Sequence, residues 1–279
     1  MYTSPIRLIA VDLDGTVLND RKQLTPRTAA ALTAAAARGV EIVPATGRTA
    51  AGLPAELLAL PGVRYAITSN GARMMDLAAG RAVRELYLPR EKALASFDIL
   101  ARYDCVTDLF QDGKGYTTEA NRAAAYRFVP ENLRDYVLRT RTVLPDLREF
   151  IAAQERGIEK LTIFFLEEAE RQKAWAEVAA LGVDVVSSLP LNMEINAAGV
   201  DKGAGLLALA EQLGLPTGAL MACGDGGNDT AMIQAAGLGV AMANAFPEVK
   251  AAAKFVTASN NEDGVALAVE KFVLGKEAL

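Results

Sequence analysis

The chain has 279 residues, 51% hydrophobic and 23% charged, a composition typical of a globular protein with one large domain or two ordinary ones. Its net charge of −5 and the lack of any apolar run of about 18 residues argue against nucleic-acid and membrane partners. The chain has no histidine, which excludes Ser-His-Asp catalysis and histidine-containing zinc sites. Any catalysis must therefore use carboxylates, lysine, hydroxyl groups and a metal held by oxygen.

The cysteine content and the N-terminus both bear on the cellular compartment. The two cysteines, Cys105 and Cys223, are too few for a disulfide scaffold and fit a reducing environment. The first predicted strand begins after about five residues, which leaves no room for a secretory signal. We therefore expect a cytoplasmic protein.

The N-terminal part alternates between predicted strands and a helix. A buried strand comes first, and the helix after it has Thr25 as N-cap, Pro26 as its first residue and Gly39 as its stop. Two further strands are predicted within residues 40–48 and 63–72, each running into a polar loop. Strand, helix and strand at this spacing indicate βαβ units and a parallel sheet.

The middle of the chain differs in composition and pattern. It holds most of the tyrosines and phenylalanines, and its strand-like runs are separated by helical stretches. We predict a separate α+β domain over residues 85–189, inserted between two parts of one core, residues 1–84 and 190–279. The predicted core is an α/β fold with a Rossmann-like, doubly wound, mainly parallel sheet.

The last third returns to the alternation of helices and strands. Asp201 is the predicted N-cap of one helix, and the strand over residues 219–223 runs into a glycine-rich loop. A second helix, two short strands and a final helix follow. Because ligands of open α/β sheets bind at the carboxyl ends of the strands, the polar residues there are the candidates for chemistry.

Asp12 and Asp14 follow the first strand. Residues two apart in an extended segment project to the same side, so both carboxylates can face one site. Because they repel each other, either a cation lies between them or one of them holds a proton. Mg²⁺ fits this demand. The alternative is a plain Asp-Gly turn. A calcium-binding loop is excluded because Thr16, Val17 and Gln23 occupy positions where that loop needs other residues.

The segment Gly224–Asp229, GDGGND, is a second candidate. Asp225 lies at a predicted strand end, and Asn228 and Asp229 open the next helix. A simple turn with Asn228 as N-cap explains the asparagine and the glycines. It does not explain Asp225, which suits a metal site that already holds two carboxylates.

The second strand ends in Thr46, Gly47 and Arg48. A hydroxyl, a backbone N–H and a guanidinium together form a phosphate cradle. A turn with a solvated arginine is an equally good interpretation.

Lys202 lies in the first turn of the helix that Asp201 caps. A cation opposes the helix dipole at that end, by a few tenths of a kcal/mol, unless an anion binds there. An exposed lysine that tolerates this small penalty is the alternative.

Four segments in this order, DLDGT, ATGR, DKG and GDGGND, closely resemble the four motifs of the haloacid dehalogenase superfamily. The long insert between the second and third motifs is similar to that of the Cof-type branch, which carries a C2B cap. The resemblance covers nearly the whole chain. One departure is Gly227, where many relatives carry an acidic residue, and it affects no metal ligand.

The resemblance implies roles for the motif residues. Asp12 would attack phosphorus to form an aspartyl-phosphate, and Asp14 would act as general acid and base. Mg²⁺ would be held by Asp12, Asp14 (through its backbone carbonyl) and Asp225. Lys202 would hold the phosphate and the nucleophile together and would itself be oriented by Asp229. The catalytic residues would be Asp12, Asp14, Thr46 and Lys202, and the substrate-binding residues Leu13, Thr46, Gly47, Arg48, Asn196, Lys202 and Asn228.

The function implied by the resemblance is that of a Mg²⁺-dependent phosphatase acting on a small phosphorylated metabolite, such as a sugar phosphate. Asp14 is important here, because ion-pumping relatives carry threonine at that position. A phosphomutase of the phosphomannomutase type is the alternative, since it forms the same intermediate. A non-catalytic Mg²⁺- or phosphate-binding regulator is the alternative from another class.

Overall fold

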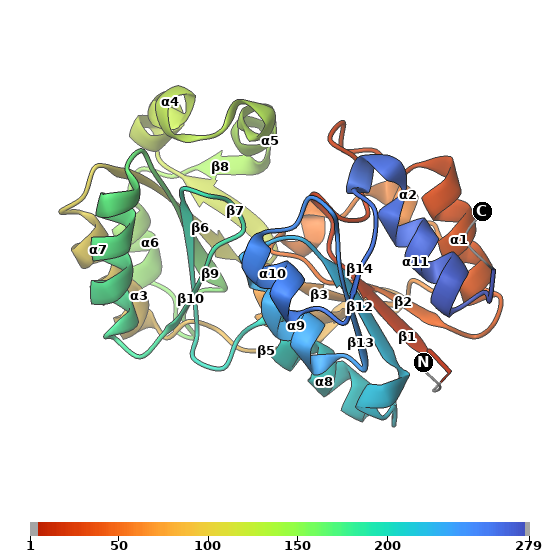
Figure 1. Cartoon of the computed structure of the whole chain (residues 1–279). Coiled ribbons are helices and arrows are strands. Elements are labelled where there is room, and N and C mark those ends of the chain that lie inside the picture. Colours follow the sequence, from red (N-terminus) through yellow and green to blue (C-terminus); the bar gives the residue numbers. More distant parts are fainter. Residues whose placement is uncertain (1–4, 277–279) are drawn as a thin grey trace. The chain divides into compact units, whose positions relative to one another are not determined.

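The computed structural model describes residues 5–276, which form two compact units (Figure 1). The first unit contains the chain up to Gly47, Leu53–Arg84 and the chain from Asp201 onward. The second unit contains Arg48–Gly52 and Glu85–Val200. Each unit has its own sheet and its own apolar core.

The first unit is built on a five-stranded parallel sheet with the order β14-β13-β12-β1-β2. Its strands are β1 Leu8–Val11, β2 Glu41–Pro44, β12 Leu220–Gly224, β13 Leu238–Ala241 and β14 Phe255–Val256. Its helices are α1 Pro26–Ala36, α2 Ala55–Leu58, α8 Lys202–Gln212, α9 Thr230–Ala235, α10 Pro247–Ala252 and α11 Gly264–Phe272. The predicted fold class, an α/β core with a parallel sheet, is confirmed.

Two of the helices begin where the sequence predicts. The Thr25 hydroxyl accepts a hydrogen bond from the Thr28 N–H at 3.2 Å, and α1 begins at the next residue. The Asp201 carboxylate accepts from the Ala204 N–H at 2.7 Å and caps α8 in the same way. α8 and α9 then pack on one face of the sheet, against β1 residues such as Leu8.

The segment after β2 departs from the predicted βαβ pattern. β3 Tyr65–Thr68 pairs antiparallel with β4 Arg73–Asp76, and both belong to a separate three-stranded sheet with β5 Arg81–Glu85. A single parallel bridge, Ala45 to Ile67, connects β3 to the end of β2. The cause is the tight 3₁₀ turn Ser69–Gly71, whose three residues all have positive φ and reverse the chain at once.

The second unit is an α+β fold with a six-stranded sheet of order β10-β11-β9-β6-β7-β8. All its pairings are antiparallel except the one between β7 and β8. Its strands are β6 Cys105–Gln111, β7 Lys114–Thr117, β8 Arg141–Val143, β9 Lys160–Phe165, β10 Asp184–Val186 and β11 Asn192–Asn196. Its helices are α3 Arg90–Leu100, α4 Glu119–Phe128, α5 Glu131–Thr140, α6 Leu147–Ala152 and α7 Glu168–Ala179.

The boundaries of the second unit differ in part from the predicted cap. The unit begins at Glu85, where the prediction placed it, but extends to Val200 rather than to residue 189. The reason is β11, which pairs antiparallel with β9 and β10 and therefore belongs to this sheet. The short segment Arg48–Gly52 also groups with this unit.

The helices of the described part of the chain are short. Within residues 5–276, none combines the length and the apolar character that crossing a membrane requires.

Candidate active site

Asp12 and Asp225 leave the carboxyl ends of two neighbouring strands. β1 pairs parallel with β12, with Val11 opposite Cys223, and the Asp12 N–H donates to the Cys223 carbonyl at 3.0 Å. The two aspartates therefore emerge side by side at the edge of the sheet where ligands of such folds bind.

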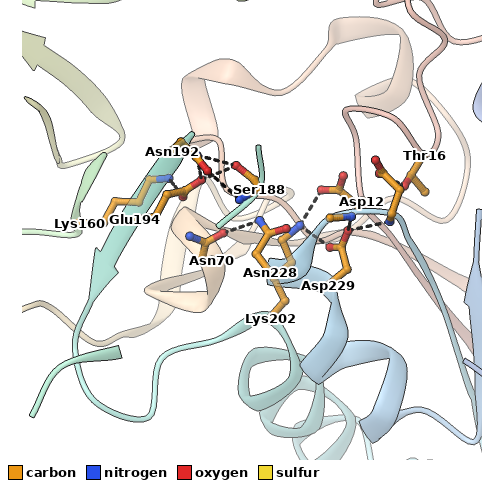
Figure 2. Close-up of polar contacts among 12 residues, drawn as sticks. Asp12, Thr16, Asn70, Lys160, Ser188, Asn192, Glu194, Lys202, Asn228 and Asp229 are labelled. Carbon is orange, nitrogen blue, oxygen red and sulfur yellow. Dashed lines mark hydrogen bonds and ion pairs between the residues drawn. The ribbon is translucent and has the colours of Figure 1, made fainter. Parts of the chain in front are cut away.

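Three carboxylates gather at this edge. One carboxylate oxygen from each of Asp12, Asp225 and Asp229 lies within 4.8 Å of the others. The ammonium group of Lys202 donates to Asp12 Oδ1 and to Asp229 Oδ1, at 2.6 Å each (Figure 2). The Lys202 side chain is fully buried, so the interpretation of this residue as an exposed surface lysine is wrong.

Asp229 holds the glycine-rich loop in place. Its second oxygen, Oδ2, accepts hydrogen bonds from the N–H groups of Asp225 and Gly226, at 2.9 Å each. A Cβ atom at Gly224 would lie 2.4 Å from the Cβ of Asp229, so only glycine allows this approach. The carboxylate that pairs with Lys202 thereby also positions the backbone of Asp225.

Asp225 is enclosed by the turn after β1. The Thr16 hydroxyl donates to Asp225 Oδ1 at 2.6 Å, and Asn244 donates to the Gly15 carbonyl at 2.8 Å. Gly15 has φ +81°, and a Cβ there would lie 2.3 Å from Asp225 Oδ2. Thr16 was not among the predicted site residues, because its contact with Asp225 depends on the pairing of β1 with β12.

The electrostatics of this cluster favour a bound cation. Burial, followed by the charge of Asp229, raises the pKa of Asp12 well above its usual 3.8 and that of Asp225 to about 7. Burial disfavours the charged form of Lys202, but Asp12 and Asp229 outweigh it, and the pKa of this lysine is raised. One ammonium group among three carboxylates leaves an excess of negative charge.

The Asp14 carboxylate lies outside the three-carboxylate cluster. Its Oδ1 pairs with the ammonium group of Lys22 at 2.7 Å, and both side chains are about one-third exposed. The extended geometry assumed for residues 12–14 ends with β1 at Val11, because the chain turns there and the Leu18 N–H donates to the Leu13 carbonyl. The role of Asp14 as general acid and base stays a prediction.

The loops after β2 and β3 lie against the glycine-rich loop. The Asn70 N–H donates to the carbonyl of buried Thr46 at 3.0 Å, and the Asn228 side-chain amide donates to Asn70 Oδ1 at 3.1 Å (Figure 2). Asn228 lies inside the 3₁₀ turn Gly227–Asp229 and is not an N-cap. Asn70 was not among the predicted site residues. The Ser-Asn-Gly sequence, which is typical of a turn, could have indicated it.

The other four predicted substrate-binding residues are Leu13, Gly47, Arg48 and Asn196. The Leu13 side chain is fully buried, and Gly47 follows Thr46 at the end of the first segment of the core unit. Arg48 belongs to the second unit, where its guanidinium lies 4.9 Å from the ring centroid of Tyr136 and donates to the Gly52 carbonyl. Asn196 ends β11, also in the second unit, and is fully buried. Their roles in binding stay predictions.

The donor set fits a divalent cation that prefers oxygen ligands. Asp12 and Asp225 each present carboxylate oxygens to one point, and the cluster is short of positive charge. The cluster can therefore hold a divalent metal ion.

The model of one protein family matches residues 9–269, and its description is haloacid dehalogenase-like hydrolase. The chain belongs to this family. It is 36% identical to YxeH of Bacillus subtilis, with 97% of this chain and 99% of that protein covered. It is 32% identical to the 5-amino-6-(5-phospho-D-ribitylamino)uracil phosphatase YcsE of the same organism, with 96% of each covered.

Among solved structures, this hydrolase is similar to the HAD subclass IIB sugar phosphatase BT4131. The TM-score is 0.83 at 25% sequence identity, and 95% of this chain and 98% of that chain are covered. The predicted membership of the haloacid dehalogenase superfamily is thus confirmed, and the protein is an enzyme of the phosphatase type.

Proposed function

We propose that this hydrolase cleaves phosphate monoesters of small metabolites, with Mg²⁺, through an aspartyl-phosphate on Asp12. The observation that carries the proposal is the buried pairing of Lys202 with both Asp12 and Asp229 beside Asp225. The hydrogen bond from Lys202 holds one carboxylate oxygen of Asp12 in place. All four side chains lie at the carboxyl edge of the sheet. The names of relatives such as YcsE and BT4131 support phosphate esters as substrates.

The first step forms a bond between an Asp12 carboxylate oxygen and phosphorus, and breaks the ester bond between phosphorus and the leaving oxygen. Asp14 donates a proton to that oxygen. Asp14 then removes a proton from the water that cleaves the aspartyl-phosphate, which restores Asp12 and releases inorganic phosphate. Asp12 and Asp14 pair with different lysines, Lys202 and Lys22, which supports different roles for the two acids.

The chain must offset the repulsion between a carboxylate and an anionic phosphate. Lys202 supplies one positive charge, and its contact with Asp229 keeps the ammonium group in place. Asp12, Asp225 and the backbone carbonyl of Asp14 would hold the Mg²⁺, which when bound neutralises further negative charge on the phosphate. The Thr16 hydroxyl orients the Asp225 carboxylate for that purpose.

The phosphate oxygens would be held by neutral donors. Thr46, the Gly47 N–H and the Asn228 amide supply these donors, and the backbone at Leu13 lies next to the nucleophile. The contact of Asn228 with Asn70 restricts the orientation of its amide. Arg48 and Asn196, in the second unit, are proposed to contact the remainder of the substrate.

The test is metal-dependent hydrolysis of p-nitrophenyl phosphate. The Asp12→Asn variant should lose at least about 10³-fold in kcat, because an amide is a poor nucleophile. Asp20→Asn is the matched control: Asp20 is an exposed acid of the same loop whose carboxylate binds Asn260 and Asn261, and its loss should leave kcat unchanged.

Two results would contradict the proposal. Equal activity of the wild type and Asp12→Asn would show that Asp12 is not the nucleophile. It would favour a non-catalytic role for the metal site. Conversion of a sugar phosphate to its isomer without release of inorganic phosphate would identify a phosphomutase instead.

A further inference from the structure

The loop between β13 and α10 lies along the segment that carries Asp225. The Met242 N–H donates to the Gly224 carbonyl, and the Phe246 N–H donates to the Asp225 carbonyl, at 3.1 Å each. The loop therefore holds the backbone of this proposed metal ligand on both sides. Asn244 lies midway between the two contacts, and all of these residues belong to the first unit.

Asn244 connects this loop to the turn after β1. Its side-chain amide donates to the Gly15 carbonyl at 2.8 Å, and the same nitrogen lies 3.5 Å from Asp225 Oδ2. The turn and the carboxylate are themselves in close contact, because a Cβ at Gly15 would lie 2.3 Å from that oxygen. One amide group therefore contacts both the turn and the carboxylate that the turn encloses.

The Gly15 carbonyl is held differently from other carbonyls of this turn. The Leu13 carbonyl, for example, accepts from the Leu18 N–H of the same turn at 3.0 Å, so local geometry orients it. The Gly15 carbonyl instead accepts from a side chain 229 residues later in the chain. Its orientation therefore depends on a tertiary contact.

The amide of Asn244 is held in one orientation. Its Oδ1 accepts from the Asn260 N–H at 3.1 Å, so its nitrogen is the atom that faces Gly15. A flipped amide would place an oxygen against the Gly15 carbonyl, and two acceptors cannot form a hydrogen bond. Asn260 is buried, and its own amide donates to the Leu18 carbonyl at 3.1 Å.

Stability alone is a weak reason for the contact between Asn244 and Gly15. Asn244 is exposed, and water competes for a hydrogen bond in such a place, so the net contribution to folding is small. The side chain is also neutral and adds no charge to the carboxylate cluster. Its effect at the cluster is therefore on the direction of nearby oxygen atoms, and outer contacts of this kind tune the affinity of metal sites.

We propose that Asn244 is a positioning residue of the metal site and not itself a ligand. It fixes the Gly15 carbonyl and thereby orients the preceding peptide group, whose oxygen is the Asp14 carbonyl proposed to bind Mg²⁺. Its weaker contact with Asp225 Oδ2 limits the rotation of that carboxylate. The inference rests on the metal site of the proposed function.

The experiment measures Mg²⁺ binding to the whole protein without substrate, by isothermal titration calorimetry. Asn244→Ala should raise the Kd for Mg²⁺ about tenfold, because the backbone ligand loses its fixed orientation. The unfolding temperature in metal-free buffer should change little, since the lost hydrogen bond is exposed.

Assays with p-nitrophenyl phosphate separate positioning from a general structural role. For Asn244→Ala, the Mg²⁺ concentration that gives half-maximal rate should rise by the same factor as the Kd. The kcat at saturating Mg²⁺ should stay close to that of the wild type. A variant with a loosened fold would instead lose unfolding temperature and kcat together, and this result would overturn the inference.

Asn261→Ala is the matched control. Asn261 is also an exposed asparagine that contacts the loop after β1, but at Asp20. Its amide donates to Asp20 Oδ2 at 2.8 Å, and its Oδ1 accepts from the Asp20 N–H at 3.1 Å. Its loss removes two hydrogen bonds to the loop and none to a proposed metal ligand, so the Kd for Mg²⁺ should stay unchanged.

The outcomes separate this inference from the proposed function. An equal Kd of wild type and Asn244→Ala overturns the inference, and so does an equal rise in Kd for both asparagine variants. Neither result affects the proposed function while the wild type hydrolyses p-nitrophenyl phosphate. Mg²⁺ binding that only Asn244→Ala weakens, without hydrolysis by the wild type, supports the inference and overturns the proposed function. Absence of both binding and hydrolysis overturns both.

Discussion

Lys202 shows how much one buried side chain can determine at this site. Its ammonium group contacts two carboxylates at 2.6 Å and is enclosed by the protein. The sequence placed a lysine against the helix dipole, and the structure shows why it is tolerated: the anions it needs come from two distant loops. We therefore expect Lys202 to stabilise the fold as well as to take part in the chemistry.

We expect Lys202→Met to lower the free energy of unfolding by about 3–5 kcal/mol in metal-free buffer at pH 8, because Asp12 and Asp229 would remain buried without a counter-charge. Urea unfolding followed by circular dichroism measures this.

Lys22→Met is the control for the loss of a lysine. It removes the partly exposed pair with Asp14 and should cost about 1 kcal/mol or less. Similar costs for the two variants would show that the Lys202 pairs do not stabilise the fold.

At the scale of elements, the turn after β3 supports the start of α8. Gly71 has φ +103°, and a Cβ there would lie 2.4 Å from the carbonyl oxygen of Asp201, the residue that caps α8. The glycine therefore lets the turn that carries Asn70 approach the helix that carries Lys202. Because glycine has no side chain, these two parts of the site can lie close together.

Gly71→Ala should accordingly lower stability by about 2 kcal/mol more than Gly80→Ala and should also reduce kcat, because Lys202 would move with the end of its helix. Gly80 is the control since it has φ +63° but no atom within 4 Å of the added methyl group. Urea unfolding and p-nitrophenyl phosphate assays on both variants test this. Equal effects would mean that the contact with Asp201 adds nothing.

At the scale of the whole molecule, the carboxylate cluster lies entirely in the first unit, and its charge connects stability with pH and metal. Without metal, Asp225 has a folded pKa of about 7 against an ordinary 3.8. Between these values the folded state keeps a proton that the unfolded chain releases. Stability due to this group therefore falls as pH rises through that window.

We expect Mg²⁺ to raise the unfolding temperature, and to raise it more at pH 8 than at pH 6, because the cation must displace the proton from the cluster. At 100 times its dissociation constant the ion should add about 2.7 kcal/mol. Differential scanning fluorimetry over a Mg²⁺ titration at both pH values measures the effect.

Asp225→Asn should remove most of this response, whereas Asp20→Asn should keep it. If the two units unfold in separate steps, the shift should belong to the unit that holds the cluster. A shift of the same size at both pH values would argue against a proton on Asp225.

Several features of the fold and the site could be predicted from the sequence. Thr25 and Asp201 predicted the starts of their helices because capping is decided within four residues. The alternation of strands and helices predicted the parallel core, and the four motifs in their order predicted the family.

Tertiary structure alone decided the rest, because it depends on pairing between segments distant in the chain. The contact of Asn70 with Asn228 and the assignment of β11 to the second unit both arise this way. So does the position of Thr162 on β9. Alternation along β9 shows only that Thr162 shares a face with Lys160, and it takes the register with β6 and β11 to place that hydroxyl between two carboxylates.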